Sequence, residues 1–371
     1  MEKTPTVYDV AAHAGVSIAT VSRVFRRPDA VRPATRDLVM ASVKALAYVP
    51  SGSARGLAAR KTGVLGLYFP GLDAIEELDD AEFESSGRVD VIVDRRGIED
   101  VRSPNLYFDE VLRGSELEAW RRGFALMVGV GRSLGPASME AMVNEIAGRV
   151  DGIAVLAESV SDDVLAHVSR RIPVVLIAGP RRGDDFDHVS VSNSEGMRTL
   201  TEHLVETHRV TAPEYVAGPM GSPDDTERYE GFSQALVAHG IDPASLTVHR
   251  ADFSRMRARE LARNLVDAGT LPRALVCAND QMALGILDVL ADRGIRVPED
   301  VIVTGFDGLD EGRQSTPSLT TIKQPMVDLG RAATRVMASR LADPGQPPIS
   351  LRLSVQVLLR ASSEGAAANP S

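Results

Sequence analysis

The 371-residue sequence predicts a small all-α domain at the N-terminus, followed by a larger α/β domain built from two lobes. Two observations lead to this prediction. In the first 47 residues, apolar side chains recur with the spacing of short helices. From Gly63 onward, short continuous apolar runs alternate with helical patterns, which is typical of parallel sheets covered by helices on both faces. This second part has roughly 300 residues, too many for one such sheet of typical size, so two lobes are expected.

The N-terminal domain is predicted to contain three short helices. Thr6 precedes the first helix, with Asp9 three residues later as in a capping box, and Gly15 ends it. Ser17 has the N-cap position of the second helix. The third helix is expected to begin near Pro33, because proline is favoured in a first helical turn.

The domain boundaries follow from changes in texture along the chain. A stretch rich in proline, glycine and serine separates the helical part from the α/β part, and the alanine-rich C-terminus resembles a disordered end. The predicted divisions are a helical domain at 1–48, a linker at 49–62, a two-lobed domain at 63–360 and a disordered tail at 361–371.

Composition restricts the class of protein. The single cysteine, Cys277, excludes an internal disulfide framework and a multi-cysteine zinc cluster, and it is expected to be a packing residue, as is Trp120. The N-terminus lacks the apolar core of a signal peptide, and no run of about 18 apolar residues occurs. A cytoplasmic protein without a membrane partner is therefore expected, and no cofactor or metal is predicted.

The charge is distributed unevenly. The net charge is −10, yet residues 1–63 contain ten basic residues against four acidic ones. A basic segment on an acidic remainder favours a polyanion-binding domain joined to a domain of another kind. A solvated basic surface is the alternative.

The most specific motif in the chain is VYDVAAHAGVSIATVSRVF, at residues 7–25. A helix-turn-helix needs a small residue where its two helices cross, a glycine at the turn and a branched apolar residue on the second helix. Ala11, Gly15 and Val21 supply these three features. The second helix can then lie in the major groove of DNA. A purely structural helical hairpin is the alternative.

The beginning of this second helix carries the candidate DNA contacts. Arg23 can make a bidentate contact to guanine, whereas Ile18 and Ala19 can meet only apolar base edges such as the thymine methyl group. Other polar residues are better placed for phosphates, which position a protein on DNA without specifying the sequence. These residues are Ser17, Thr20, Ser22 and Arg36.

Together with three later motifs, this region resembles the LacI/GalR family of bacterial transcriptional repressors. The later motifs are ANDQMALG (278–285), VPEDVIVTGFDG (297–308) and PSLTTIKQP (317–325), and the resemblance runs to the strand near Leu359. It implies a helix-turn-helix headpiece and a two-lobed effector domain that is similar to periplasmic binding proteins. The implied function is a transcriptional repressor whose affinity for operator DNA is controlled by a small molecule, above all a sugar, bound between the lobes.

The resemblance also implies an assembly and a hinge. A homodimer, with a tetramer as the alternative, would bind a pseudo-palindromic operator. Residues 49–62 would be the hinge, with Leu57 inserted into the minor groove and Ala54 on the same face. The implied lobes are lobe 1 at about 63–191 and 321–346, and lobe 2 at about 192–320 and 347–360.

The effector contacts implied by the family are Arg228, Asn279 and Asp307, an aromatic wall at Phe253, and the pair Tyr107 and Phe108 in the first lobe. The sequence agrees with this placement, because Asn279 and Asp307 end apolar runs, and ligands of α/β lobes bind beyond the carboxyl ends of the strands. The alternatives are a turn-forming aspartate at 307, a surface salt bridge at 228 and core packing at 253. Asp280 is expected to cap the following helix.

The sequence departs from the family pattern at two places that bear on which ligand is bound. Residues 72–104 form an acidic insertion before the first helix of lobe 1, where the family passes almost directly from strand to helix. Ala178 stands where many sugar-binding members have an acidic or amide residue.

Two other classes of protein compete with a regulator. An enzyme is disfavoured because the seven histidines are scattered and no nucleophile–base pair or phosphate-binding glycine loop is apparent. A solute-binding protein with the same lobes would need an export signal and would lack the headpiece.

Overall fold

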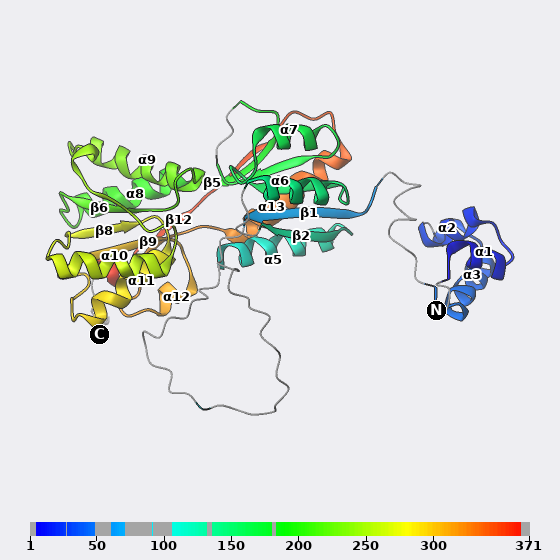
Figure 1. Ribbon diagram of the computed structural model, residues 1–371, viewed down its shortest axis with the longest axis horizontal. Helices are drawn as coiled ribbons and strands as arrows, with labels where there is room; N and C mark the ends of the chain where they lie inside the picture. The colour runs from blue at the N-terminus through cyan, green and yellow to red at the C-terminus, as the bar shows by residue number, and fades with distance from the viewer. Residues whose placement is uncertain are drawn as a thin grey trace. The chain divides into compact units, whose positions relative to one another are not determined.

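The computed structural model describes residues 5–26, 28–48, 61–70, 91, 106–131, 136–179 and 183–364. The chain divides into two compact units, residues 1–64 with 149–151, and residues 65–148 with 152–371 (Figure 1). The predicted hinge residues Ala54 and Leu57 lie outside the described residues, as does nearly all of the acidic insertion.

The N-terminal unit contains the three predicted helices. They are α1 (Val7–His13), α2 (Ile18–Arg26) and α3 (Pro33–Ala45), with a short 3-10 helix, η1 (Pro28–Ala30), between the last two. The Thr6 side chain and the Asp9 side chain form the predicted capping box, and Gly15 has a φ of +63° at the turn. Val10, Val21 and Val39, one from each helix, are completely buried and form the centre of the small core. The three helix predictions are therefore confirmed.

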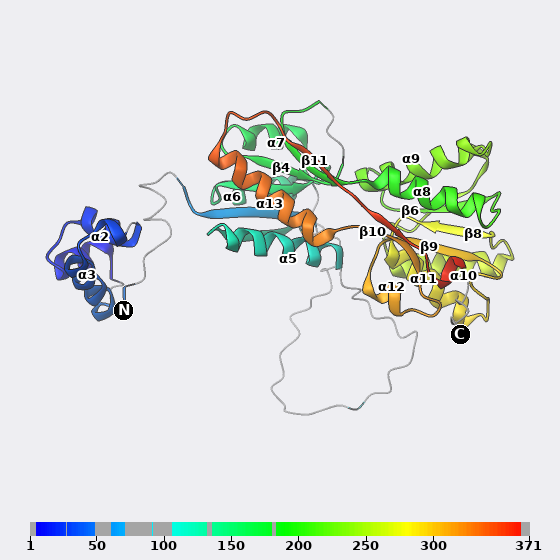
Figure 2. The same cartoon turned by 180° about the vertical axis from the view of Figure 1, so that it is seen from behind.

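The first lobe is built around a six-stranded sheet with the order β11-β5-β4-β3-β1-β2. Its strands are β1 (Val64–Pro70), β2 (Ala125–Gly131), β3 (Gly152–Leu156), β4 (Val174–Ile177), β5 (Asp187–Val191) and β11 (Ser350–Leu353). Its helices are α5 (Leu106–Arg121), α6 (Pro136–Ala147), α7 (Asp162–Ser169) and α13 (Met326–Ala342). Figure 2 shows α5 and α13 side by side. Their backbones cross closely, because a Cβ atom added at Gly114 or Gly330 would lie 1.9 or 2.0 Å from a carbonyl oxygen of the other helix.

The second lobe has a six-stranded sheet with the order β12-β10-β9-β8-β6-β7. Its strands are β6 (Pro213–Ala217), β7 (Val248–Arg250), β8 (Ala274–Cys277), β9 (Ile302–Asp307), β10 (Thr320–Lys323) and β12 (Gln356–Leu358), of which β12 is antiparallel to β10. Its helices are α8 (Asn193–Glu206), α9 (Pro223–Ala238), α10 (Arg255–Ala268), α11 (Asp280–Asp292), α12 (Asp310–Gln314) and α14 (Ala361–Glu364), with the 3-10 helix η3 (Pro243–Ser245). Helices α8 and α9 lie on one side of the sheet, and α10 and α11 on the other (Figure 1).

The predicted lobe limits are wrong at the two strands where the chain passes from one lobe to the other, β10 and β11. Strand β10 pairs with β9 and belongs to lobe 2, although residues 321–346 were expected in lobe 1. Strand β11 pairs with β5 and belongs to lobe 1, although residues 347–360 were expected in lobe 2. The apolar alternation continues from 350 to 358 without a break, so the sequence does not mark where the chain passes from one sheet to the other.

Two further predictions need correction. Residues 361–364 are not part of a disordered tail but form α14, in which Ser362 Oγ donates a hydrogen bond to the carbonyl oxygen of Val303 at 2.5 Å. Cys277 is completely buried as expected, but Trp120 is 80% exposed on α5 and is not a packing residue. Among the described helices, none has the length and apolar character needed to cross a membrane.

Candidate DNA-binding and effector sites

Helix α2 presents the predicted base-reading residues on one outward face. Ile18, Ala19 and Arg23 are exposed and Ser22 is half-buried. Residues three and four positions apart lie on the same side of a helix, so these four side chains form one surface. Val21 lies on the opposite side and is completely buried in the headpiece core. The face is therefore available to DNA without any change in the packing of α2.

The predicted phosphate contacts divide into two kinds. Ser17 Oγ accepts a hydrogen bond from the backbone N–H of Thr20 at 3.2 Å, and the two hydroxyls lie 2.9 Å apart, so both stabilise the start of α2. Arg36 lies on α3 with its Nε atom 3.7 Å from Asp37 Oδ1. Tyr8, which is not among the predicted contacts, is 68% exposed in the first turn of α1.

Arg228 lies in the second turn of α9, and its side chain is almost completely buried. Its Nε atom donates a hydrogen bond to Asn193 Oδ1 at 2.9 Å, and Nη1 donates to the carbonyl oxygen of Ala278 at 2.7 Å. The guanidinium carbon lies 3.8 Å from the centre of the Phe306 ring, and Nη1 lies 3.9 Å from Asp307 Oδ1. The alternative of a surface salt bridge is therefore wrong.

Asp307 is the last residue of β9 and is also buried. Its Oδ1 atom accepts a hydrogen bond from Gln324 Nε2 at 2.7 Å. Burial raises the pKa of Asp307 to about 7; the positive charge of Arg228 opposes this effect, and the negative charge of Asp280 adds to it. Its backbone has a φ of +128°, a value that is costly for a residue with a side chain and that is found mainly at functional sites.

Asn279, rather than Asp280, is the N-cap of α11. Its Oδ1 atom accepts a hydrogen bond from the backbone N–H of Met282 at 2.9 Å, which corrects the prediction that Asp280 is the cap. Asp280 is completely buried and accepts hydrogen bonds from the backbone N–H groups of Gly308 and Leu309 at 2.9 and 2.8 Å. It therefore fixes the loop that follows Asp307.

Phe253 lies just after β7 and is half-buried beside Arg228, whose guanidinium carbon is 5.9 Å from the ring centre. The ring covers Gly218 so closely that a Cβ atom there would come within 2.4 Å of it. Phe253 has a φ of +60°, an unfavourable value for an aromatic residue. It packs against the core of lobe 2, as the alternative interpretation expected, and it also borders the predicted site.

The first lobe brings Tyr107 to the same place. Tyr107 and Phe108 lie in the first turn of α5, and their rings are 5.4 Å apart. Phe108 packs against Phe69 at 4.5 Å and so belongs to the core of its own lobe. Burial raises the pKa of the Tyr107 hydroxyl well above its ordinary value, with a further contribution from the carboxylate of Asp224 in lobe 2. Tyr107 therefore faces the second lobe, whereas Phe108 packs between Tyr107 and the core of the first lobe.

Two polar residues of this region, Asn193 and Gln324, were not predicted. Asn193 is completely buried at the start of α8, and its Nδ2 atom donates hydrogen bonds to Asp224 at 2.8 Å and to Glu227 at 3.0 Å. Gln324 lies within the PSLTTIKQP motif. The signal for Asn193 was its position just after the alternating valines of β5 (Asp187–Val191), where the chain passes between the lobes.

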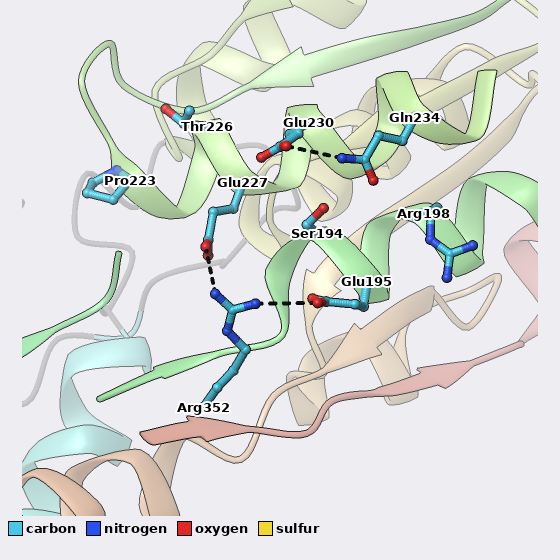
Figure 3. A pocket seen from close by; sticks show the side chains of 9 residues that line it. All are labelled: Ser194, Glu195, Arg198, Pro223, Thr226, Glu227, Glu230, Gln234 and Arg352. Carbon is cyan, nitrogen blue, oxygen red and sulfur yellow. Dashed lines mark hydrogen bonds and ion pairs between the residues drawn. The ribbon is translucent and has the colours of Figure 1, made fainter. Parts of the chain in front are cut away.

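A polar pocket of about 410 Å³ is lined by residues of α8 and α9 and by Arg352 (Figure 3). Arg352, from β11 of the first lobe, extends toward it and pairs with Glu195 at 3.3 Å and Glu227 at 3.5 Å. None of the predicted effector residues lines this pocket. Its importance lies in the ion pairs, which join a strand of lobe 1 to two helices of lobe 2.

Comparisons with known proteins agree with this architecture. Residues 6–51 match the family described as bacterial regulatory proteins, lacI family, and residues 201–363 match a periplasmic binding protein-like domain. The HTH-type transcriptional regulator CelR of Thermobifida fusca is 30% identical over 364 residues, which cover 96% of this chain and 98% of CelR.

Solved structures give the same result. A CelR–cellobiose complex is 29% identical, with a TM-score of 0.66, and the match covers 97% of this chain and 100% of that one. The lac repressor bound to ONPG in its repressed state is 25% identical, with a TM-score of 0.78 and the same coverage of 97% and 100%.

The predicted combination of a helix-turn-helix headpiece with a two-lobed domain similar to periplasmic binding proteins is thereby confirmed. Relatives that match over more than nine-tenths of the chain are named as HTH-type transcriptional regulators or repressors. The chain belongs to the LacI family of bacterial transcriptional regulators.

Proposed function

We propose that this regulator is a repressor whose affinity for operator DNA is controlled by a small carbohydrate bound between the two lobes. The observation that carries the proposal is the convergence of Arg228, Asp307 and Tyr107, which come from different elements of both lobes. Since β6, β8 and β9 are neighbours in one sheet, the residues after their carboxyl ends meet at one edge.

The chemistry of these residues suits a sugar. Arg228, Asp307 and Gln324 supply directional donors and acceptors, and Phe253 and Tyr107 supply flat apolar surfaces. A ligand that leaves one buried polar group without a partner loses about 1–3 kcal/mol, which allows the site to discriminate among sugars. The cellobiose complex of CelR supports a carbohydrate of one or two rings as the effector class. Asn279 already caps α11 through its oxygen, so we assign it a contact through its amide nitrogen only.

The DNA-binding part of the proposal rests on the exposed face of α2. Arg23, Ile18 and Ala19 read bases, while Ser22, Arg36 and the hydroxyls of Ser17 and Thr20 contact phosphates. One headpiece covers only a half-site, so a homodimer on a pseudo-palindromic operator in the cytoplasm completes the proposal. Ala54 and Leu57 are assigned to the hinge on the sequence alone.

A thermal-shift screen of mono- and disaccharides, cellobiose included, tests the effector assignment on the full-length protein. A ligand at 100 times its Kd stabilises the folded state by about 2.7 kcal/mol and raises the unfolding midpoint. Asp307→Ala should lose this response while still binding operator DNA. The control is Asp267→Ala, which also removes an aspartate paired with an arginine, Arg293, but at the surface.

Two outcomes would contradict the proposal. Equal sugar affinity in wild type and Asp307→Ala would show that the effector does not bind at this site. A sugar that binds at this site but leaves operator affinity unchanged would instead favour a solute-binding role without regulation.

A further inference from the structure

Two histidines and a glutamate converge where α8 ends beside α14, in the second lobe. His203 lies in the last turn of α8, His208 follows that helix after a short turn, and Glu364 is in α14. The Nε2 atoms of both histidines lie 2.9 Å from the same carboxylate oxygen, Oε1 of Glu364. The two imidazole rings are 5.2 Å apart and meet edge to face.

The three side chains offer one ligand atom each, and these atoms lie within 4.8 Å of one another. A tetrahedral zinc ion has bonds of about 2.0–2.1 Å to histidine nitrogen and carboxylate oxygen, so its ligand atoms are separated by roughly 3.3 Å. To admit an ion, side-chain rotations must lengthen the two 2.9 Å contacts and shorten the widest separation among the ligand atoms, which is up to 4.8 Å. All three side chains are partly exposed, which leaves further coordination positions to water.

The surroundings of the cluster hold these ligands in place. Thr207 Oγ1 lies 3.2 Å from Nδ1 of His203, so the hydroxyl can accept a hydrogen bond from Nδ1–H in the tautomer that leaves Nε2 free to bind a metal. The Ser363 hydroxyl donates to Glu364 Oε1 at 2.9 Å.

The position of α14 does not depend on the histidines. Ser362 Oγ donates to the carbonyl oxygen of Val303 at 2.5 Å and accepts from the backbone N–H of Thr320 at 2.8 Å. Thr320 Oγ1 also accepts a hydrogen bond from the backbone N–H of Arg360 at 2.7 Å. Sheet-bound contacts thus fix the helix that carries Glu364, and a site with prepositioned ligands loses less entropy when it binds an ion.

The remaining histidine–glutamate pairs of lobe 2 look different. His239 pairs with Glu206 at 3.0 Å, and His249 pairs with Glu214 at 2.6 Å. Each has a single imidazole and forms an ordinary ion pair or hydrogen bond. Only at Glu364, among the described residues, do three possible ligands gather around one point.

We propose that His203, His208 and Glu364 form a binding site for one divalent transition-metal ion, with Zn²⁺ as the best match to two imidazoles and a carboxylate. The ion replaces the imidazole protons that face the carboxylate, and water completes its coordination. It joins α14 to the end of α8, so it stabilises lobe 2. The site is separate from the effector residues and does not depend on the effector being a sugar. The sequence offered no spacing motif for this site, because Glu364 is far from the two histidines along the chain.

The test is metal binding by the full-length protein without a histidine tag. Equilibrium dialysis should give one bound Zn²⁺ per chain, and Co²⁺ should give the visible absorption of a site with nitrogen and oxygen ligands. The double variant His203→Gln, His208→Gln should lose both signals, and Glu364→Gln should weaken binding at least tenfold. His239→Gln is the matched control and should bind as wild type does.

A second measurement protects the test against loss of folding. Zn²⁺ should raise the unfolding midpoint of wild type and of His239→Gln, but not that of the double variant, whose circular dichroism should remain native. Binding well below one equivalent in wild type would overturn the proposal. So would a full equivalent retained by the folded double variant, since the ion would then be bound elsewhere.

Discussion

At the scale of single residues, the second lobe concentrates buried charged groups around Asp307. Asp307 is buried next to Arg228, and its pKa is raised to about 7 because burial outweighs the attraction of the guanidinium group. Asp280, a neighbour in the same network, has a pKa raised by burial to about 6. A buried carboxyl with a shifted pKa is a candidate functional group, and it is suited to form hydrogen bonds with a ligand rich in hydroxyl groups.

The raised pKa of Asp307 predicts a pH-dependent stability. The folded protein retains the Asp307 proton over a pH range in which the unfolded chain has already released it, so this residue lowers stability as pH rises from about 4 to about 7. Asp307→Asn cannot ionise and should remove this loss. Since each pKa unit corresponds to about 1.4 kcal/mol, the variant should gain up to about 4 kcal/mol over wild type above pH 7.

This difference can be measured by urea unfolding without a sugar at pH 5 and pH 8. The negative charges of Asp280 and Asp307 interact, so the comparison measures the titration of the pair. An advantage of Asp307→Asn that is the same at both pH values would mean that the aspartate is ionised throughout.

A second residue-scale prediction concerns Arg23. Its side chain is exposed on α2 together with Ala19, and a bidentate contact to guanine is worth about 1–3 kcal/mol. Arg23→Ala should therefore weaken operator binding by this amount and relax the preference at one base position. Arg36→Ala, which removes a proposed phosphate contact, should weaken binding evenly across sequences. Binding to a set of single-base operator variants at fixed salt measures both, and a uniform loss for Arg23→Ala would exclude base reading.

At the scale of elements, short sequence motifs were sufficient to predict the helices of the headpiece, but not to predict which strand of residues 350–358 belongs to which lobe. The capping box at Thr6 and the positive φ at Gly15 depend on a few neighbouring residues, so their motifs were visible in the sequence. The division of residues 350–358 between two sheets depends on pairing with β5 and β10, which lie far away in sequence. For the same reason Asn193 was missed, since its partners Asp224 and Glu227 come from another helix.

The contacts of Asn193 connect the predicted effector residue Arg228 to β11, one of the strands at which the chain passes between the lobes. Arg228 bonds to Asn193, Asn193 bonds to Glu227, and Glu227 pairs with Arg352 of β11, which belongs to the other lobe. Figure 3 shows the pair of Glu227 and Arg352. We expect a change at Arg228 on binding of the proposed effector to reach Arg352, which lies on a strand of the other lobe. Continuous networks of this kind transmit coupling when the elements they join have two arrangements.

Arg352→Met should reduce the coupling between effector and operator by about 0.5–2 kcal/mol while changing effector affinity little. Methionine keeps the apolar part of the side chain but removes both ion pairs. The control is Arg296→Met, which breaks a surface pair with Asp300. Operator affinity is measured with and without saturating sugar, and coupling equal to that of wild type would show that the ion pairs have only a structural role.

At the scale of the whole molecule, the first lobe carries an exposed apolar surface. Leu117 and Trp120 lie three positions apart on α5 and are 49% and 80% exposed. Val128 and Val130 lie on the same face of β2, the edge strand of the sheet, and are 39% and 44% exposed. Apolar side chains gathered on neighbouring elements commonly mark a protein interface, and edge strands are usually protected from uncontrolled pairing.

We expect this surface to take part in the proposed homodimer. Trp120→Arg places a charge where the interface requires apolar contact, so the variant should shift from dimer to monomer in sedimentation velocity runs at micromolar concentration. Its folded lobes should still bind the sugar, because Trp120 lies in the last turns of α5 whereas Tyr107 lies in the first. A monomer contacts one half-site, so affinity for the full operator should fall to the level of an isolated half-site.

Val237→Arg, at a residue that is 63% exposed on α9, is the control and should remain dimeric. If Trp120→Arg stays dimeric and keeps full operator affinity, the interface lies elsewhere on the molecule.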